Sequence, residues 1–407
     1  MAQFSLQSSS TVKPTVAPRR GVPLLETPFF GLLEPVTVDG PTLYDFDGSL
    51  ARQHVLALWT WLCRDAAQDV LERVQDGPEL LAAMPELLRR VRAAGSAAQA
   101  NADARKRLRV QLGGEEVVAR LPIMMEALRH CGVFDKAQAL GRAMNLASDE
   151  AAVGLTLKSM PLHDAQLAAF LMHALVAQVA NPAKLLSAAA QQANGATEMA
   201  LARAGFAPLV DGVIAHAQNV LAAPVWRAGV FADMDLACRL LERYHRLVRA
   251  LHVNVDLQRH GLWWVATSEL TRKISENLEP RLREVGTQVI HALRRTREGP
   301  DALDQEGLLT ALNSIYLLAT VRECRESLAL NVVCEEAWTL TGAALEQHVR
   351  RNLELFKTNP SDPIAAARLD AGIKMSEIRF GGEFARALRQ ARDGVMRRQL
   401  NGGEPKS

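Results

Sequence analysis

The sequence predicts an all-α protein, with antiparallel helix pairs in a solenoid-like or irregular arrangement followed by a long-helix bundle. Apolar residues recur at spacings of three and four from Ser49 to Leu400, which is the period of one helix face. The apolar stretches are interrupted at Gly, Pro and Asn-Pro, residues that end helices. Aromatic residues form only 5% of the chain, whereas strands favour aromatic and β-branched residues. These three observations favour packed helices over sheets.

The chain of 407 residues is long for a single core, so we expect two packed units. Breaks are frequent up to Pro224 and rare from Asp233 onwards, so we place a soft boundary near Pro224. The serine cluster and the prolines at the start predict a tail that cannot bury enough apolar surface to fold. The expected parts are a disordered tail at 1–23, an extended apolar arm at 24–45, a short-helix domain at 46–224, a long-helix bundle at 225–400 and a disordered tail at 401–407.

The arm is expected because prolines alternate with large apolar residues. Pro23, Pro28 and Pro35 exclude a regular helix there. Six large apolar side chains should nevertheless not stay in water, so we expect the arm to dock on its own helices. Docking on a neighbouring chain is the alternative. The six residues are Leu24, Leu25, Phe29, Phe30, Leu32 and Leu33.

The helices then follow in order, beginning with one that Ser49 caps and that runs to Val74. Its broad apolar stripe indicates burial on two sides. Glycines such as Gly95 are expected to divide the next part of the chain into short helices. Longer stripes in the second half predict a bundle, in which Pro280 starts a new helix or kinks the old one. These stripes are Leu241, Tyr244, Val248, Leu251 and Val255, and Leu270, Ile274, Leu278, Leu282, Val285, Val289 and Leu293.

Composition argues against several functional classes. A net charge of +2 gives no bulk attraction for a polyanion. The five cysteines contain no C-x-x-C, so neither a disulfide framework nor a zinc site is expected, and a cytoplasmic location fits. The start shows neither the basic region nor the apolar run of a signal peptide. No apolar run reaches the ~18 residues that a membrane helix needs, so we expect no transmembrane segment.

The string Asp45-Phe46-Asp47-Gly48-Ser49 is the most enzyme-like part of the chain. It resembles the nucleophile loop of haloacid-dehalogenase-type phosphatases, and this resemblance implies that Asp45 attacks phosphorus, Asp47 acts as acid and base, and Mg²⁺ assists. That family also needs an apolar strand before the loop and a parallel sheet, which this sequence does not predict. We therefore interpret Gly48 as a turn residue and Asp47 or Ser49 as a helix cap, with calcium binding less favoured still.

No other motif predicts catalysis or a cofactor. Glu242 and His245 form the Glu-x-x-His unit that di-iron bundles use twice, but the sequence has one copy only. Neither a glycine-rich nucleotide loop nor a G-x-S-x-G nucleophile motif occurs. The sequence therefore predicts no metal, no cofactor and no catalytic residue that can be named.

The remaining functional signals are surfaces. A basic segment with a local charge of +6 could meet an acidic protein, nucleic acid or an anionic membrane, although a solvated helix face is the simpler interpretation. It contains no aromatic residue for base stacking. Trp263 and Trp264 start a helix, where one exposed ring would make an interface anchor, as would Phe29 and Phe30. The basic residues are Arg89, Arg90, Arg92, Arg105, Lys106, Arg107 and Arg109, and a weaker strip contains Arg379, Arg386, Arg389, Arg392, Arg397 and Arg398.

Together these features predict a non-catalytic helical scaffold or adaptor from a GC-rich, bacterial source that binds another protein or forms a homo-oligomer. Two alternatives stay open. A secreted bacterial effector is suggested by the Ser/Thr-rich start, which is similar to a type III export leader. A helical enzyme whose site has no local signature is the other alternative.

Overall fold

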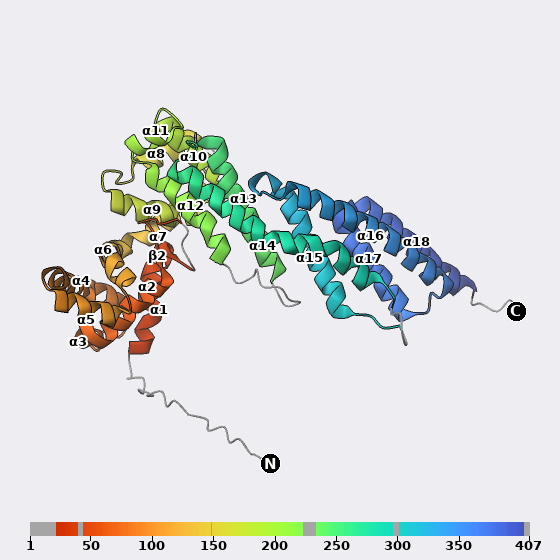
Figure 1. Cartoon of the computed structure of the whole chain (residues 1–407), viewed down its shortest axis with the longest axis horizontal. Coiled ribbons are helices and arrows are strands. Elements are labelled where there is room, and N and C mark those ends of the chain that lie inside the picture. Colours follow the sequence, from red (N-terminus) through yellow and green to blue (C-terminus); the bar gives the residue numbers. More distant parts are fainter. Residues whose placement is uncertain (1–21, 40–43, 148, 223–232, 296–300, 403–407) are drawn as a thin grey trace, which may run out of the picture. The chain divides into compact units, whose positions relative to one another are not determined.

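The computed structural model describes residues 22–39, 44–147, 149–222, 233–295 and 301–402. Within these ranges the chain is almost entirely helical (Figure 1). The described part contains two short strands, β1 (Thr37–Val38) and β2 (Leu50–Ala51), which pair with each other. The prediction of an all-α fold is therefore confirmed. The predicted tails lie outside the described residues, apart from Val22, Pro23 and residues 401–402, which are helical.

The chain forms two units, and neither is one continuous piece of sequence. Unit 1 contains residues 1–37 and 52–134, and unit 2 contains residues 38–51 and 135–407. The predicted boundary at Pro224 lies outside the described residues. The helices before and after it, α12 (Ala207–Ala222) and α13 (Met234–Asn254), pack against each other inside unit 2. The division that the structure shows thus falls elsewhere in the sequence.

Unit 1 is a group of helices in which α4 contacts α1, α3, α5 and α6. Asp76 caps α4 by accepting a hydrogen bond from the backbone N–H of Glu79, and Asn101 caps α5 in the same way. The elements are α1 (Val22–Leu33), a 3₁₀ turn (Glu34–Val36), α2 (Arg52–Trp61), a π-helical turn (Leu62–Ala66), α3 (Gln68–Leu71), α4 (Gly77–Ala100), α5 (Ala102–Leu112), α6 (Glu115–His130) and a 3₁₀ turn (Cys131–Val133).

The expectation of an extended arm at 24–45 was wrong, because residues 22–33 form the helix α1 with Pro28 inside it. Leu25, Phe29 and Leu33 are spaced by four residues and are completely buried. Burying three such side chains contributes about 4.5–9 kcal/mol, which exceeds the cost of about 3 kcal/mol for an internal proline. The Phe29 ring stacks on Trp59 of α2 at a centroid distance of 4.6 Å. The segment therefore docks within its own chain, as we expected, but as a helix.

Two further expectations about helix boundaries were also wrong. The helix predicted from Ser49 to Val74 starts only at Arg52, and a π-helical turn separates α2 from α3. Gly95 does not break α4, which continues to Ala100. A helix tolerates a single glycine at a cost of about 1 kcal/mol, so a glycine alone does not define an end.

Unit 2 contains the longest helices. Its helices are α7 (Phe134–Met144), α8 (Glu150–Lys158), α9 (Ala165–Gln178), α10 (Pro182–Gln192), α11 (Glu198–Arg203), α12, α13, α14 (Leu262–Leu293), α15 (Gln305–Glu323), α16 (Asn331–Thr358), α17 (Pro363–Phe380) and α18 (Gly382–Gly402). α14 runs through Pro280 as one helix and packs against α15 and α16. The stripe from Leu270 to Leu293 is buried along its whole length, as its spacing predicts.

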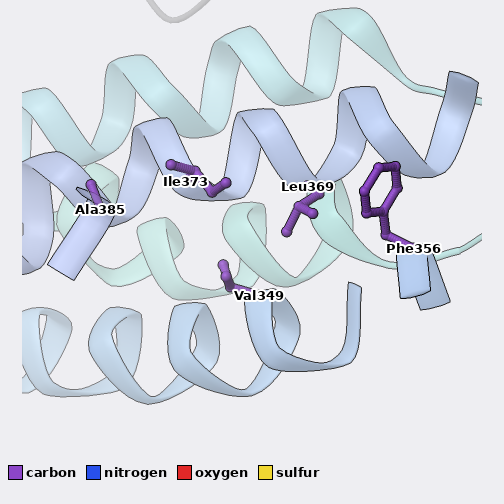
Figure 2. Packing of buried hydrophobic residues seen from close by; sticks show 5 residues of the cluster. All are labelled: Val349, Phe356, Leu369, Ile373 and Ala385. Carbon is purple, nitrogen blue, oxygen red and sulfur yellow. The ribbon is translucent and has the colours of Figure 1, made fainter. Parts of the chain in front are cut away.

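The last helices of unit 2 share an apolar core. Figure 2 shows five buried side chains of this core between α16, α17 and α18. Val349 and Phe356 of α16 lie two turns apart, and Leu369 and Ile373 of α17 lie one turn apart, so each helix presents one face. The fifth residue is Ala385 of α18. The helical period of the sequence therefore specifies this packing directly.

Candidate functional site

The loop that follows residue 43 is fastened to unit 2 by its backbone. The N–H of Tyr44 donates to Oε1 of Gln218 at 2.9 Å, and the Gln218 Nε2 donates to the carbonyl oxygen of Tyr44 at 3.1 Å. Three residues on, the carbonyl oxygen of Asp47 accepts a hydrogen bond of 2.7 Å from Gln166 Nε2. Phe46 between them is buried against Ala169 and Ala215. The helices α9 and α12 therefore hold the loop in one position.

A half-buried carboxylate completes this attachment. Oδ1 of Asp211 accepts hydrogen bonds from the Tyr44 hydroxyl at 2.5 Å and from the Trp263 indole N–H at 2.7 Å. Burial raises the pKa of Asp211, and burial together with the nearby Asp211 charge raises the pKa of the Tyr44 phenol. The phenol therefore remains a neutral donor to the carboxylate. With two strong donors on one oxygen, Asp211 is placed to hold the loop and α14 rather than to carry a reaction.

Two histidines form a stacked pair next to Phe46 of this loop. His173 of α9 and His216 of α12 have ring centroids 4.1 Å apart and nearly parallel planes, at 18°. The His216 Nε2 lies 2.8 Å from the carbonyl oxygen of His173 and donates to it, while Nδ1 of His173 has no partner among the described residues. Burial lowers the pKa of both rings, to about 4 for His216. Both imidazoles are therefore neutral at physiological pH.

The phosphatase-like string lies in this same loop, without the surroundings that phosphatase chemistry needs. Asp47 and Gly48 form a turn, as predicted. The Ser49 hydroxyl donates to the Phe46 carbonyl oxygen at 3.3 Å, so the expected helix cap by Ser49 was wrong. The described residues contain no sheet beyond the two-residue pair of β1 and β2. Nothing in this part of the structure therefore resembles the strand ends on which that family builds its site.

The isolated Glu-x-x-His unit also has an ordinary environment. Nδ1 of His245 lies 2.9 Å from the Ser327 hydroxyl. Among the described residues, no group of three His, Cys, Asp or Glu side chains is arranged to hold a metal ion. The geometry around Glu242 and His245 is therefore that of a packed helix surface.

Much of the basic segment is neutralised by acids outside it. Glu86 accepts hydrogen bonds from Arg89 and Arg90, and those from Arg89 are the main reason why the pKa of Glu86 falls to about 2. Arg90 also pairs with Asp69 at 2.9 Å. Of the seven cations of this segment, Arg92, Lys106, Arg107 and Arg109 have no ion pair with any residue that the structure describes. The remaining member, Arg105, pairs with Glu115.

One of the unpaired cations, Arg92, lines a groove in unit 1. The groove has a volume of about 380 Å³ and lies between α4, α5 and α6. Arg92 lines it from α4. Arg109 follows the lining residue Arg105 by one helical turn on α5, whereas Arg107 points to the opposite side of that helix. Most of the remaining lining is apolar or small: Gly95, Ser96, Ala98, Gln99, Leu108, Val118, Ala119, Leu121, Pro122 and Met125.

The aromatic candidates have mainly structural positions. Phe29 is completely buried and Phe30 is half-buried. Trp263 is 7% exposed and donates to Asp211, while Trp264 is half-buried with its ring edge-on to His260. Phe29 and Trp263 therefore pack inside their own units rather than standing exposed as interface anchors. Sequence reasoning missed the groove itself, for which Gly95 and the small residues of α4 were the available signal.

No family model matches this chain, and no curated protein or solved structure matches it either. None of the described helices combines the length and apolar character that crossing a bilayer requires.

Proposed function

We propose that this protein is a non-catalytic adaptor or scaffold and that unit 1 binds an acidic, amphipathic helix of another protein. The observation that supports this proposal is the groove between α4, α5 and α6, with its apolar lining and the unpaired Arg92 in its wall. Arg109 has no ion pair among the described residues and lies one helical turn from the lining residue Arg105 on α5. An amphipathic helix buries one apolar face in such a groove. Its flanking carboxylates would meet the two guanidinium groups.

The apolar lining favours a protein partner over the other anionic partners. Leu121, Pro122 and Met125 gain nothing from contact with phosphates, which bind cations and backbone donors. Single-stranded nucleic acid also needs aromatic platforms, and no aromatic residue lines the groove. An apolar peptide face with acidic edges matches both parts of the surface. The five free cysteines suit a reducing, cytoplasmic location for such a partner.

The test is selection from a library of displayed helical peptides on the full-length protein. We expect the selected peptides to share apolar residues at spacings of three and four, flanked by Asp or Glu. Arg109→Glu should weaken binding of a selected peptide about 5–30-fold, the effect of ~1–2 kcal/mol for reversing a charge at the edge of an interface. The matched control is Arg107→Glu, which makes the same charge change on the far side of α5 and should leave binding within about twofold, because salt screens charges beyond about 8 Å.

The proposal fails if no acidic amphipathic peptides are enriched or if the two reversals weaken binding equally. The protein is also tested with vesicles of anionic lipid and with a single-stranded oligonucleotide. If it binds one of these, and Arg109→Glu weakens that binding while Arg107→Glu does not, the partner is an anionic membrane or a nucleic acid and the peptide proposal is wrong.

A further inference from the structure

Two arginines from different helices lie over one tryptophan ring in unit 2. The guanidinium carbon of Arg379 on α17 is 4.1 Å from the ring centroid of Trp338 on α16, and that of Arg322 on α15 is 4.6 Å from it. Both distances are within the ~6 Å of a cation–π contact. The packing of α15, α16 and α17 against one another brings these three residues together. We call them the arginine–tryptophan cluster.

The guanidinium group of Arg379 is held in place on several sides. Its Nε donates to the carbonyl oxygen of Trp338 at 2.9 Å, and the ring centroid of Phe380 lies 4.9 Å from its guanidinium carbon. Gly342 of α16 leaves room for the group, since a Cβ at this position would lie 2.7 Å from Nη2 of Arg379. The two Nη atoms of Arg379 have no acceptor among the described residues. The group is therefore held in one orientation with most of its N–H donors unused.

The positive charge of this cluster exceeds the negative charge beside it. Arg379 has no ion pair with any residue that the structure describes. Glu335 lies 3.5 Å from Arg322 and 3.3 Å from Arg325, so one carboxylate faces two guanidinium groups. Three cations and one carboxylate leave a local charge of +2. Burial and the charge of Arg322 lower the pKa of Arg379, as expected where positive charge is in excess.

We propose that the arginine–tryptophan cluster binds the phosphate group of a phosphorylated side chain of another protein. A phosphate monoester carries a charge of about −1.5 to −2 near pH 7, which matches the local excess, whereas a carboxylate would neutralise only half of it. Guanidinium groups bind phosphate oxygens through paired, charge-assisted hydrogen bonds. Clusters of arginine recognise phosphorylated segments in this way. The proposal concerns unit 2 and does not depend on the function proposed for the groove of unit 1.

The confinement of the unpaired charge favours a single phosphate group over a polyanion. Nucleic acids and anionic membranes are bound by rows of cations that face many phosphates. Arg389 and Arg392, which belong to the basic strip that the sequence indicated, both pair with acids of unit 2. The strip therefore offers no continuous row of unpaired cations among the described residues. A point-like dianion suits the cluster better than an extended chain of phosphates.

The experiment is fluorescence anisotropy of the full chain with a labelled peptide library in which random residues flank a fixed phosphoserine. The reference is the same library with serine at the fixed position. We expect the phosphoserine library to bind about tenfold more tightly or better, because hydrogen bonds to charged groups are the stronger ones. In Arg379→Gln this difference should vanish. Arg386→Gln removes the same charge from an exposed position of α18, so it is the control and should keep the difference.

Glu335→Gln distinguishes a binding site from a packing contact. This change removes the carboxylate that faces the cluster, so the phosphoserine library should bind about fivefold more tightly because a repulsive charge is lost. A purely structural role of the stacked arginines predicts no such gain. Circular dichroism of each variant verifies that the helices are retained.

Equal binding of the two libraries, an equal loss in Arg379→Gln and Arg386→Gln, or no gain in Glu335→Gln would each overturn the proposal. The protein is also tested with vesicles that contain phosphatidylinositol phosphates and with a single-stranded oligonucleotide. If it binds one of these but not the phosphoserine library, and Arg379→Gln abolishes that binding, the ligand is a membrane or a nucleic acid and the proposal is wrong.

Discussion

Mild acid should destabilise unit 2, because two neutral imidazoles are stacked in its interior. The ring centroids of His173 and His216 lie 4.1 Å apart, and the Phe46 ring lies 6.0 Å from that of His173. Burial lowers the pKa of both, and His216 also lowers that of His173 because two stacked cations would repel. The guanidinium group of Arg243 adds to this effect at His216. Protonation of either ring therefore requires this part of the structure to open.

The direction and size of the effect follow from linkage. In the unfolded chain an imidazole binds a proton below about pH 6.5, whereas folded His216 does so only near pH 4. The contribution to stability is therefore fully present above pH 6.5 and is lost as the pH falls from 6.5 towards 4. Between pH 7.5 and pH 5.5 the low pKa of His216 alone removes roughly 1 kcal/mol of stability, and His173, whose pKa burial also lowers, adds a loss in the same direction.

The assay is urea unfolding followed by circular dichroism at pH 7.5 and pH 5.5. His216→Gln keeps a donor for the His173 carbonyl but cannot be protonated, so the part of the acid-induced loss that His216 causes should disappear. His291→Gln, at an exposed position of α14, is the control and should keep the full loss. An identical pH dependence in His216→Gln and the wild type would refute this reasoning. An NMR titration of the His216 ring with its midpoint near pH 6.5 would also refute it.

Two further predictions concern stability. Phe29→Ala should lower the free energy of unfolding of unit 1 by about 3–5 kcal/mol, because the buried ring leaves a cavity against Trp59; an unchanged urea midpoint would contradict docking of α1 within the chain. Gly48→Ala should lower the melting temperature, because the added Cβ would lie 2.4 Å from the carbonyl oxygen of Ala169. Gly31→Ala is its control, since that Cβ meets nothing within 4 Å in α1, and should raise the melting temperature.

The sequence predicts the helices well because the spacing of apolar residues by three and four can be recognised within each segment alone. The stripe from Leu270 to Leu293 is buried as its spacing requires, and Leu25, Phe29 and Leu33 show the same spacing of four. Pro28 led us to expect no helix at residues 22–33, because the rule against proline in helices describes only the free-energy cost within the helix itself. Three buried side chains outweigh that cost, and their burial depends on α2 and α4, which the local sequence does not reveal.

The charge of the basic segment shows a different limit of sequence reasoning. A count from Arg89 to Arg109 leaves out Glu86 before it and Glu115 after it, and these two acids pair with three of the seven cations. The first is one turn away on the same helix, so helical spacing could have identified it. Asp69 belongs to a different helix, α3, and only the packing of α3 on α4 brings it to Arg90.

Contacts between distant residues explain why the loop from residue 44 to 51 could be predicted only as a turn. Tyr44 and Asp211 are 167 positions apart in the sequence. The residues next to each of them in the sequence do not indicate that the two side chains form a hydrogen bond. The aspartates of this loop suggested a catalytic role, whereas in the structure its aromatic residues attach the loop to unit 2. Tyr44 donates to Asp211, and Phe46 is buried on α9 and α12. The backbone of Asp47, rather than its carboxylate, accepts the hydrogen bond from Gln166. A motif read from side-chain chemistry alone therefore gives such a loop the wrong role.

The same loop connects the folding of the two units. Residues 1–37 and 52–134 belong to unit 1, while residues 38–51 belong to unit 2, so the chain leaves the first unit and returns to it. Attachment of Tyr44 and Phe46 to α9 and α12 requires contacts between residues more than 120 positions apart, and closing such long loops costs entropy before any contact is gained. The local helices of unit 1 need no such closure. We therefore infer that α4, α5 and α6 can form early, and that the loop is fastened only once α9 and α12 of unit 2 have packed.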